Sequence, residues 1–445
     1  MGPAVTPPRR ATVPPAAGPS SSPVGRAAFR FAVLYLSLYA AATQLLGGIL
    51  ILPWASLPAL GTVWPLRDVT VAVAEHVFGL TPPLEFRGTS GDTAFHWVQT
   101  FWILAVSLAG AAIWYVSDPD SRRDARLRPW FRLFLRFALA AEMFYFGMAK
   151  VIPAQFPPPA LVTLVEPVGH LSLSNLLWTF VGAATPYQVF TGCAEVIGGL
   201  LLFAPRTTML GALICLADMA HVLVLNLSYD VGLKQISFHL ALISLVLLAP
   251  DARRLAGMFL RDAPVPASTV PPLFADARRN RRALAAQLAF GVYLLAMFTT
   301  LSVRFYAAEG GPGAPRSALY GIWDVAALSV DGEIRPAMLN DYDRRWRRIV
   351  FDSPQRFIVQ RTDDSFLTYG VTIHEASGTM ALTKGSSRTW SAAFSYERAA
   401  DDRLVLDGHI DGRHVRAELR LMGLDTFRLL NSGFRWIRPT DNEAG

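Results

Sequence analysis

The feature that most constrains this chain is a series of seven apolar stretches, each about as long as a membrane-spanning helix. They occupy residues 30–54, 95–116, 129–150, 186–204, 207–228, 234–250 and 284–305. A helix of about 20 residues crosses the roughly 30 Å hydrocarbon layer of a bilayer, where every backbone polar group must be paired within the protein. The sequence therefore predicts a membrane all-α bundle of about seven transmembrane helices.

The composition supports a membrane protein. Hydrophobic residues make up 52% of the chain and charged residues only 17%, whereas soluble domains carry roughly 25% charge. The 41 basic against 34 acidic residues therefore do not indicate a nucleic-acid partner. Cys193 and Cys215 are too few for a disulfide scaffold or a cysteine-rich metal cluster.

Basic residues predict the orientation of the helices, since they favour the cytoplasmic side of a membrane. With the N-terminus inside, 16 arginines fall in the inside connections, and only five basic residues flank the outside ends. We therefore expect a multi-pass protein of a bacterial inner (cell) membrane, with its N-terminus cytoplasmic and its C-terminal part extracytoplasmic.

The sequence divides into four parts. Residues 1–25 are rich in Pro, Ala, Ser and Gly, a composition typical of a disordered tail. The transmembrane domain is expected at 26–305, a Gly/Pro linker at 306–316 and a second domain at 317–440. Two outside connections, 55–94 and 151–185, are long enough to cap a site.

The second domain has the pattern of antiparallel strands. Val415, Ala417 and Leu419 alternate with charged residues, and about nine or ten such short runs follow one another. This number predicts an all-β antiparallel barrel. The segment Gly321-Ile322-Trp323 resembles the start of lipocalin-like barrels, in which a late arginine packs over the tryptophan. Arg435 or Arg438 would take that part here.

Ionisable residues within the apolar stretches are the candidate functional site, because such groups are expensive in a bilayer. Counted along the helices, they fall at the midplane or in the outer half, so we predict one outward-opening polar pocket. The candidate catalytic residues are Lys150, Glu142, Glu195, Asp218, His221 and His239, and the candidate cofactor contacts are Tyr145, Asn226 and Lys234. The other reading is that these groups pair between helices and only hold the bundle together. No Glu-x-x-His pair occurs, so no metal site is predicted.

Lysine usage singles out Lys150. The chain contains only three lysines, Lys150, Lys234 and Lys384. A lysine can lose its proton when it is desolvated, whereas an arginine effectively cannot. Lys150 stands where a predicted helix meets the long 151–185 connection, while Lys234 has Asp230 as a natural partner.

Residues 129–255 resemble DoxX-family membrane proteins. The resemblance lies in FYFGMAKVIP at 144–153, in GCAEVIGGLLLFAPRTTMLGAL at 192–213 and in the run ending LLAPDARRL at 247–255. The first of these is also similar to the transmembrane domain of vitamin K-dependent carboxylases, where the corresponding lysine is proposed to deprotonate a quinol. DoxX proteins usually have four spans, and the cysteines needed for thiol exchange are absent here.

These observations lead to two expectations for function. The first is a quinone-linked oxidoreductase, or a subunit of a membrane redox complex, in which a quinone or similar small apolar ligand enters from membrane lipid and other redox subunits are partners. The second is a non-catalytic scaffold or lipid-binding protein whose barrel recruits a partner. No nucleic acid is expected in either case.

Overall fold

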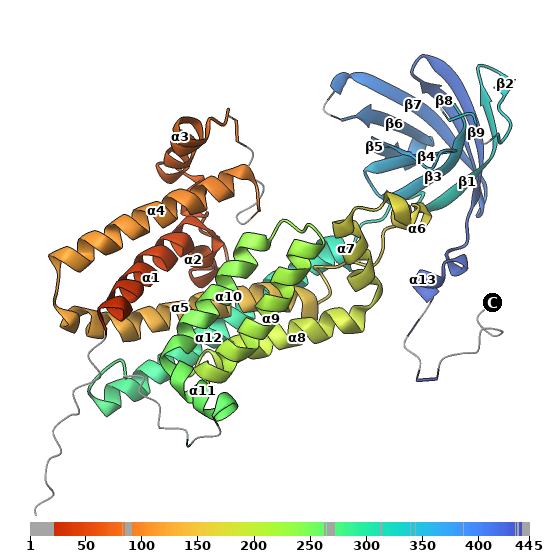
Figure 1. Cartoon of the computed structure of the whole chain (residues 1–445). Coiled ribbons are helices and arrows are strands. Elements are labelled where there is room, and N and C mark those ends of the chain that lie inside the picture. The colour runs from red at the N-terminus through yellow and green to blue at the C-terminus, as the bar shows by residue number, and fades with distance from the viewer. Residues whose placement is uncertain are drawn as a thin grey trace, which may run out of the picture.

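The computed structural model of the chain describes residues 22–81, 83, 84, 91–261, 264, 272–311, 314–338, 340–342, 344–385, 387–431, 433, 436 and 437. Within these ranges, a bundle of helices is followed by an antiparallel barrel that lies beyond one end of the bundle (Figure 1). The helices are α1 (Pro23–Ala42), α2 (Gln44–Ile49), α3 (Leu66–Phe78), α4 (Ala94–Ser117), α5 (Ser121–Val151), α6 (Leu161–Val165), α7 (Leu173–Ala183), α8 (Thr185–Leu201), α9 (Thr208–Ser228), α10 (Lys234–Leu248), α11 (Ala252–Leu260) and α12 (Ala277–Phe305).

Five described segments are long and apolar enough to cross a membrane. They are α1, α4, α9, the segment Lys234–Leu260 that contains α10 and α11, and the segment Ala277–Glu309 that contains α12. The other two predicted spans correspond to α5 and α8. Helix α8 has only 17 residues, and α5 carries several charges, so neither has the length and hydropathy of the other five.

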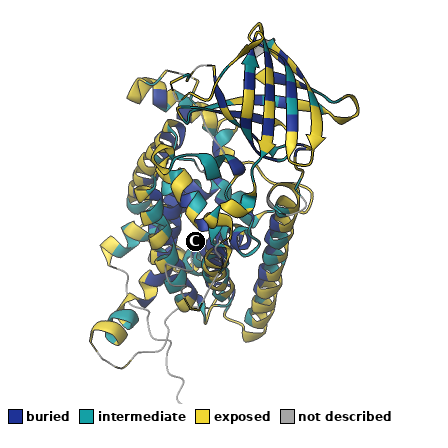
Figure 2. Ribbon diagram, turned by 90° about the vertical axis from the view of Figure 1, so that its right-hand side faces the viewer, coloured by how far each residue is buried: buried dark blue, intermediate teal, exposed yellow. Residues whose placement is uncertain are grey.

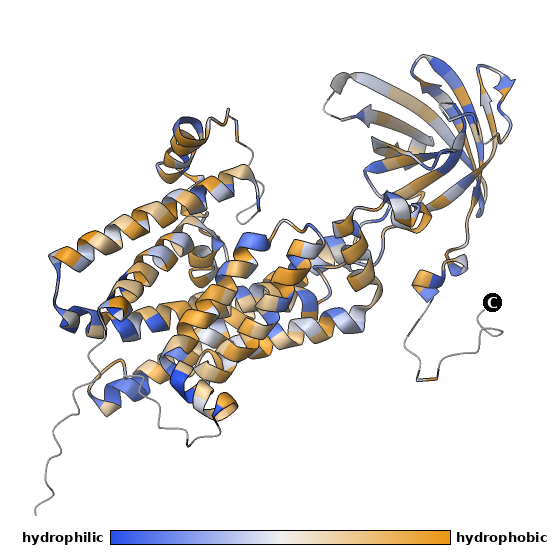
Figure 3. Ribbon diagram, viewed as in Figure 1, coloured by the Kyte–Doolittle hydropathy of each residue, from blue (hydrophilic) through white to orange (hydrophobic). Residues whose placement is uncertain are grey.

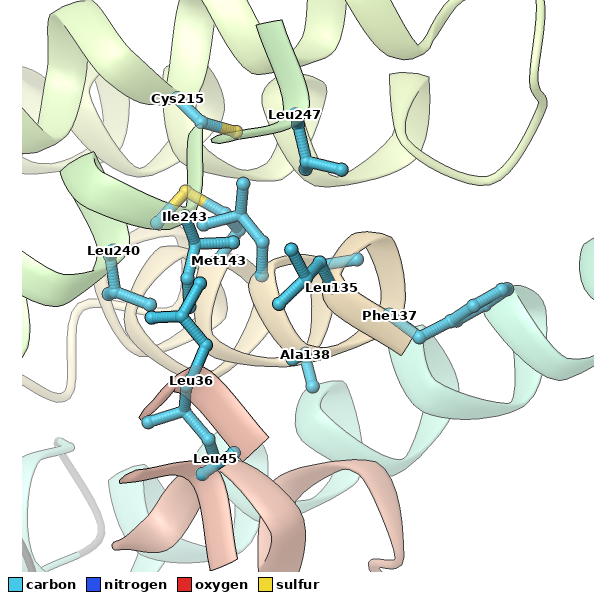
Figure 4. Close-up of a cluster of buried hydrophobic side chains, with 14 of the residues drawn as sticks. Leu36, Leu45, Leu135, Phe137, Ala138, Met143, Cys215, Leu240, Ile243 and Leu247 are labelled. Carbon is cyan, nitrogen blue, oxygen red and sulfur yellow. The ribbon is translucent and has the colours of Figure 1, made fainter. Parts of the chain in front are cut away.

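Helix α5 forms the centre of the bundle, in contact with α8, α12, α2 and α10. All of residues 135–144 are buried. Arg136 lies in this buried part and donates hydrogen bonds to the carbonyls of Leu202 and Phe203 and to the Gln287 side chain. Arg132 likewise donates to the Leu247 carbonyl, so these two arginines, which weaken the hydropathy of α5, are paired inside the protein. Figure 4 shows the apolar packing at this centre, with side chains of α5 meeting those of α1, α2, α9 and α10: Leu135, Ala138, Met143, Leu36, Leu45, Cys215, Leu240, Ile243 and Leu247.

The first predicted span, 30–54, differs from the structure. Helix α1 begins at Pro23 and ends at Ala42, and the extended backbone of Thr43 separates it from α2. A hydrogen bond from the Thr43 hydroxyl to the Tyr39 carbonyl stabilises this break. Arg30 is buried near the start of the span, where it pairs with Asp124 of α5 at 3.1 Å.

Both long connections contain helices. In the first, α3 packs on α4, and the Trp102 indole donates a hydrogen bond to the Thr70 hydroxyl at 3.0 Å. In the second, the short apolar helix α7 packs against α8. The start of the predicted linker continues α12 as a π-helical turn, Tyr306–Gly310.

The strands of the barrel are β1 (Gly321–Val330), β2 (Glu333–Ile334), β3 (Trp346–Ser353), β4 (Arg356–Arg361), β5 (Phe366–His374), β6 (Thr379–Lys384), β7 (Ser387–Ala400), β8 (Arg403–Ile410) and β9 (Arg413–Leu421). Each pairs antiparallel with the next along the order β2-β1-β3-β4-β5-β6-β7-β8-β9, and β1 also pairs with β9. Because β2 pairs only with the end of β1, eight strands close the barrel. The predicted antiparallel barrel is confirmed. A short helix, α13 (Arg428–Asn431), follows β9.

Buried and exposed residues alternate along the strands of the barrel (Figure 2). The inward set forms a filled apolar core that includes Trp323, Phe351 and Phe394. The Trp323 indole donates to the Leu319 carbonyl at 2.9 Å. Gly321 has a φ of +149°, which favours glycine, and a Cβ at this position would lie 2.5 Å from Leu421. The two arginines predicted to cover the tryptophan, Arg435 and Arg438, lie outside the described residues.

Helix α6 connects the bundle to the barrel. Leu161 of α6 packs on outward-facing residues of three strands, Ile322, Val350 and Ile358. The Gln360 amide donates a hydrogen bond to the Val165 carbonyl at 2.9 Å. The segment between α5 and α7 therefore touches the barrel wall as well as the helices.

Candidate functional site

The candidate site begins with a close approach of α5 and α8, which two glycines permit. A Cβ added at Gly147 would lie 2.9 Å from the Val196 side chain, and one added at Gly192 would lie 2.6 Å from the Lys150 Cβ. Small residues at such a contact let two helix backbones come together. The pairing places Lys150, at the end of α5, opposite Glu195 in the middle of α8.

Lys150 and Glu195 form a buried ion pair. The Lys150 Nζ lies 2.6 and 2.8 Å from the two carboxylate oxygens of Glu195. The two residues are 7% and 1% exposed, so water does not screen this pair. A buried pair of this kind stabilises a fold only weakly relative to apolar packing. Its burial is therefore only weak evidence for a contribution to stability.

Asp218 of α9 adds a second carboxylate to the pair and interacts electrostatically with both Lys150 and Glu195. Its Oδ2 is buried, and the described residues supply it no hydrogen-bond partner. The Oε1 of Gln155, just after α5, is likewise buried without a donor in the described part of the chain. Buried acceptors normally have partners, so these two oxygens mark positions where a ligand with hydrogen-bond donors would be stabilised.

These groups line a cavity between α5, α7, α8, α9 and α10, with an empty volume of about 780 Å³ counted out to its open side. Most of its remaining wall is apolar or aromatic, with Phe156, Trp178 and Tyr187 among the larger side chains. Helix α7, which forms one wall, lies at the barrel end of the bundle (Figure 1). The cavity therefore has a charged part and an apolar part, as a site for an amphipathic ring needs.

Two further predicted residues line the same cavity. His221 is one helical turn beyond Asp218 and is exposed. Asn226 is buried, and its amide donates to the Leu233 carbonyl and the Ser237 hydroxyl at 3.1 and 3.2 Å. The described structure thus brings together Lys150, Glu195, Asp218, His221 and Asn226.

Glu142 does not lie at this cavity, contrary to the prediction of one shared pocket. It stands eight residues before Lys150, about 12 Å farther along α5. Its carboxylate accepts a hydrogen bond from the Gln44 amide of α2 at 2.6 Å. Its depth was predicted from the sequence, but the break at Thr43 that places α2 beside it was not.

His239 belongs to a third group, on the α1 side of α10. Its ring stacks on Tyr39 with centroids 3.5 Å apart, and its Nε2 is 2.7 Å from the Tyr35 hydroxyl. Its Nδ1 lies 2.7 Å from the Gln235 carbonyl. Tyr35 and Tyr39 were not among the predicted residues, although their i, i+4 spacing on α1 puts them on one helix face.

Tyr145 and Lys234 also lie apart from the cavity. Tyr145 is five residues from Lys150, on another side of α5, and its ring packs against Phe298 of α12. Lys234 pairs with Asp230 at 2.9 Å, as predicted. The backbone N–H groups of Lys234 and Gln235 donate to the carboxylate of Asp92. These two hydrogen bonds satisfy N–H groups at the start of α10 that have no partner within the helix.

Sequence reasoning missed Gln155, Phe156 and Trp178 as cavity residues. All three come from the connection 151–185, which was predicted only to cap a site. Aromatic residues in that connection were the available signal. Among the described residues, no group of three or more His, Cys, Asp or Glu side chains is arranged to hold a metal ion. Of the predicted residues, those around Lys150 line a cavity with room for a small organic molecule.

Comparison with known proteins yields one relative of interest. No family model matches the chain, and no solved structure matches it. Over 132 residues, the chain is 33% identical to the protein YwoB of Bacillus subtilis (strain 168), which is described as uncharacterized. The match covers 30% of this chain and 81% of YwoB.

Proposed function

We propose that this protein, which belongs to the same family as YwoB of Bacillus subtilis, is a membrane protein that binds a quinone in the cavity around Lys150. In this proposal, the seven helices α1, α4, α5, α8, α9, α10 and α12 cross the inner membrane with the N-terminus cytoplasmic. The barrel and the cavity then lie toward the outer side. The likeness of 144–153 and 192–213 to DoxX proteins agrees with this assignment, since those segments carry Lys150 and Glu195.

The observation that carries the proposal is the set of polar atoms in the cavity wall. The Lys150 ammonium is a donor, while Asp218 Oδ2 and Gln155 Oε1 are buried acceptors that lack donors among the described residues. The reduced form of a quinone carries two hydroxyl donors, and the oxidised form carries two carbonyl acceptors. A wall with both kinds of group can bind either form, and the apolar part can hold the ring and the start of its tail.

The chemistry assigned to the site is proton transfer at the ring oxygens. Lys150 donates a hydrogen bond to a quinone carbonyl, and its ion pair with Glu195 holds the ammonium in position. If a quinol were oxidised here, Glu195 and Asp218 would be the carboxylates placed to accept its two protons, and another redox subunit of the membrane would take its two electrons. His221, on the exposed side, is placed to pass protons on.

A binding measurement tests the proposal. The full-length protein, extracted in detergent, is examined by absorbance and mass spectrometry for a co-purifying quinone. It is then titrated with a short-chain quinone and its quinol while tryptophan fluorescence is recorded, because Trp178 lines the cavity. Loss of one charged hydrogen bond is worth about 1.5–3 kcal/mol, so Lys150→Ala should weaken binding about tenfold or more.

Lys384→Ala is the matched control, since it removes a lysine from strand β6 of the barrel. It should bind as the wild type does. Equal binding by Lys150→Ala and the wild type would contradict the proposal. A protein that neither carries nor binds a quinone would favour the alternative function, a non-catalytic scaffold whose barrel recruits a partner.

A further inference from the structure

A second concave feature lies between α5 and α12, on the side of α5 away from the Lys150 cavity. It is an open groove with an empty volume of about 1370 Å³. Helix α5 contributes Trp130, Leu133, Phe134 and Phe137, which follow the i, i+3, i+4, i+7 spacing of one helix face. Helix α12 contributes two small residues, Ala283 and Ala286, which leave room between the helices.

The groove runs along the two helices from one end of the bundle toward its middle. Two ring contacts fix this alignment, Trp130 with Phe274 at 5.8 Å and Phe137 with Phe290 at 5.3 Å between centroids. From Arg282 to Phe290, α12 rises by about 12 Å. The length suits part of an extended hydrocarbon chain.

Two arginines lie at the end of the groove that is formed by the first turns of α12. Arg279 and Arg282 both line it and are exposed. No carboxylate in the described part of the chain lies within ion-pair distance of either guanidinium. Asp276, at the cap of α12, accepts hydrogen bonds from the backbone N–H groups of Arg278 and Arg279. The two guanidinium groups are therefore available to a ligand.

A third positive charge lies behind the groove wall. Arg136 is only 4% exposed, and its hydrogen bonds go to two carbonyls and to the Gln287 side chain at 3.0 Å. Gln287 itself lines the groove. The carbonyls bear no net charge, so the field of Arg136 adds to that of the two exposed arginines and favours an anion.

This end of the bundle is the one away from the barrel. Figure 3 shows hydrophilic residues at the starts of α5 and α12 and in α11, next to apolar stretches that lead into the bundle. Basic pockets between membrane helices on the cytoplasmic side suit anionic lipid headgroups, and tryptophans favour the same interfacial level. Trp130, at 48% exposed, takes that position here.

From this geometry we infer that the α5–α12 groove is a binding site for an anionic phospholipid. The phosphate is held by Arg279 and Arg282, and one acyl chain lies along Leu133, Phe134 and Phe290. An apolar ligand without charge would leave the guanidinium groups unused, and a small free anion would leave the groove empty. The inference depends on a membrane location but not on the quinone proposed at Lys150.

The test uses the purified full-length protein and counts bound lipids by native mass spectrometry, with phosphatidylglycerol and phosphatidylcholine of the same acyl chains as probes. Phosphatidylglycerol should bind more tightly. Each basic residue near an anionic headgroup is worth about 1 kcal/mol, so the double variant Arg279→Gln/Arg282→Gln should weaken its binding roughly 30-fold.

The double variant Arg278→Gln/Arg281→Gln is the matched control. It removes the same charge from the same turns of α12, but these two arginines do not line the groove. It should keep most of the binding. An equal loss in both double variants would show a general attraction to the basic end and would overturn the site.

A second pair of variants tests the acyl chain. Ala286→Trp should fill the groove and reduce phosphatidylglycerol binding, whereas Ala285→Trp, on a neighbouring face, should not. Unchanged binding by Ala286→Trp, or equal affinity of the wild type for the two lipids, would contradict the inference. Quinone binding should be unchanged in all four variants, so failure at one site is distinguishable from failure at the other.

Discussion

Replacing the buried ion pair of Lys150 and Glu195 by apolar residues should separate its contribution to stability from its contribution to binding. The single changes are Lys150→Met and Glu195→Leu, which keep side-chain length or volume. The two residues are 7% and 1% exposed, and their closest charged atoms are 2.6 Å apart. Removing one member of such a pair leaves an uncompensated charge and costs about 3–5 kcal/mol.

The two single changes should not cost the same, because Asp218 is a third member of the charge group. Lys150→Met leaves two carboxylates facing one another without a cation, so we expect a loss at the upper end, about 4–5 kcal/mol. Glu195→Leu leaves the ammonium with Asp218 as a remaining partner, so we expect about 3 kcal/mol. The double variant leaves only Asp218 without a cation, so it should be more stable than either single variant, with a loss of about 1–2 kcal/mol relative to the wild type.

The assay is equilibrium unfolding in mixed detergent micelles, followed by tryptophan fluorescence, with quinone titration of each folded variant. We expect the double variant to be stable but unable to bind the short-chain quinone. Additive losses in the double variant would refute the reasoning about the pair, because independent residues show no coupling. A stable double variant that still binds the quinone would remove the pair from the proposed site.

Two further predictions follow from packing and burial. Gly192→Ala should push α8 from α5, since the added Cβ would lie 2.6 Å from the Lys150 Cβ. We expect a loss of about 1–3 kcal/mol and weaker quinone binding, while Gly169→Ala, in open space, should be neutral in the same unfolding assay. In the barrel, burial raises the pKa of Asp352 although the Arg356 guanidinium lies 3.9 Å from its Oδ2, and no other described residue hydrogen-bonds its carboxylate. The charged form of Asp352 therefore destabilises the fold as pH rises above about 3.9, the pKa that an aspartate has in the unfolded chain. Asp352→Asn should stabilise the protein by about 1 kcal/mol at pH 7. Unfolding curves recorded at several pH values should show this gain vanishing near pH 4. A gain that does not depend on pH would contradict this prediction.

The sequence predicted the barrel better than the bundle. Alternation in runs such as Val415, Ala417 and Leu419 is a local property of a strand, and these residues are buried in β9 as expected. The helical stretches were located, but hydropathy could not show that Arg136 of α5 has carbonyl partners at Leu202 and Phe203. A charge looks costly in a sequence window because its partners come from other segments.

The candidate site was predicted in part for a related reason. Hydropathy and lysine usage singled out Lys150 and Glu195. The rotation of each helix about its axis decided the rest. It brought these two residues together with Asp218 and placed Glu142 and His239 in other clusters. A helix turns by about 100° per residue, so a small change in rotation or depth brings a different side chain to the same neighbour.

The linear pattern of apolar and polar residues thus sufficed for the kinds of element and for a short set of chemically unusual side chains, because both are local properties. The cavity, its two acceptor oxygens without donors, and the groove beside Arg279 required the assembled bundle. They are formed by side chains from separate helices, and their rotations and depths are set by packing between those helices.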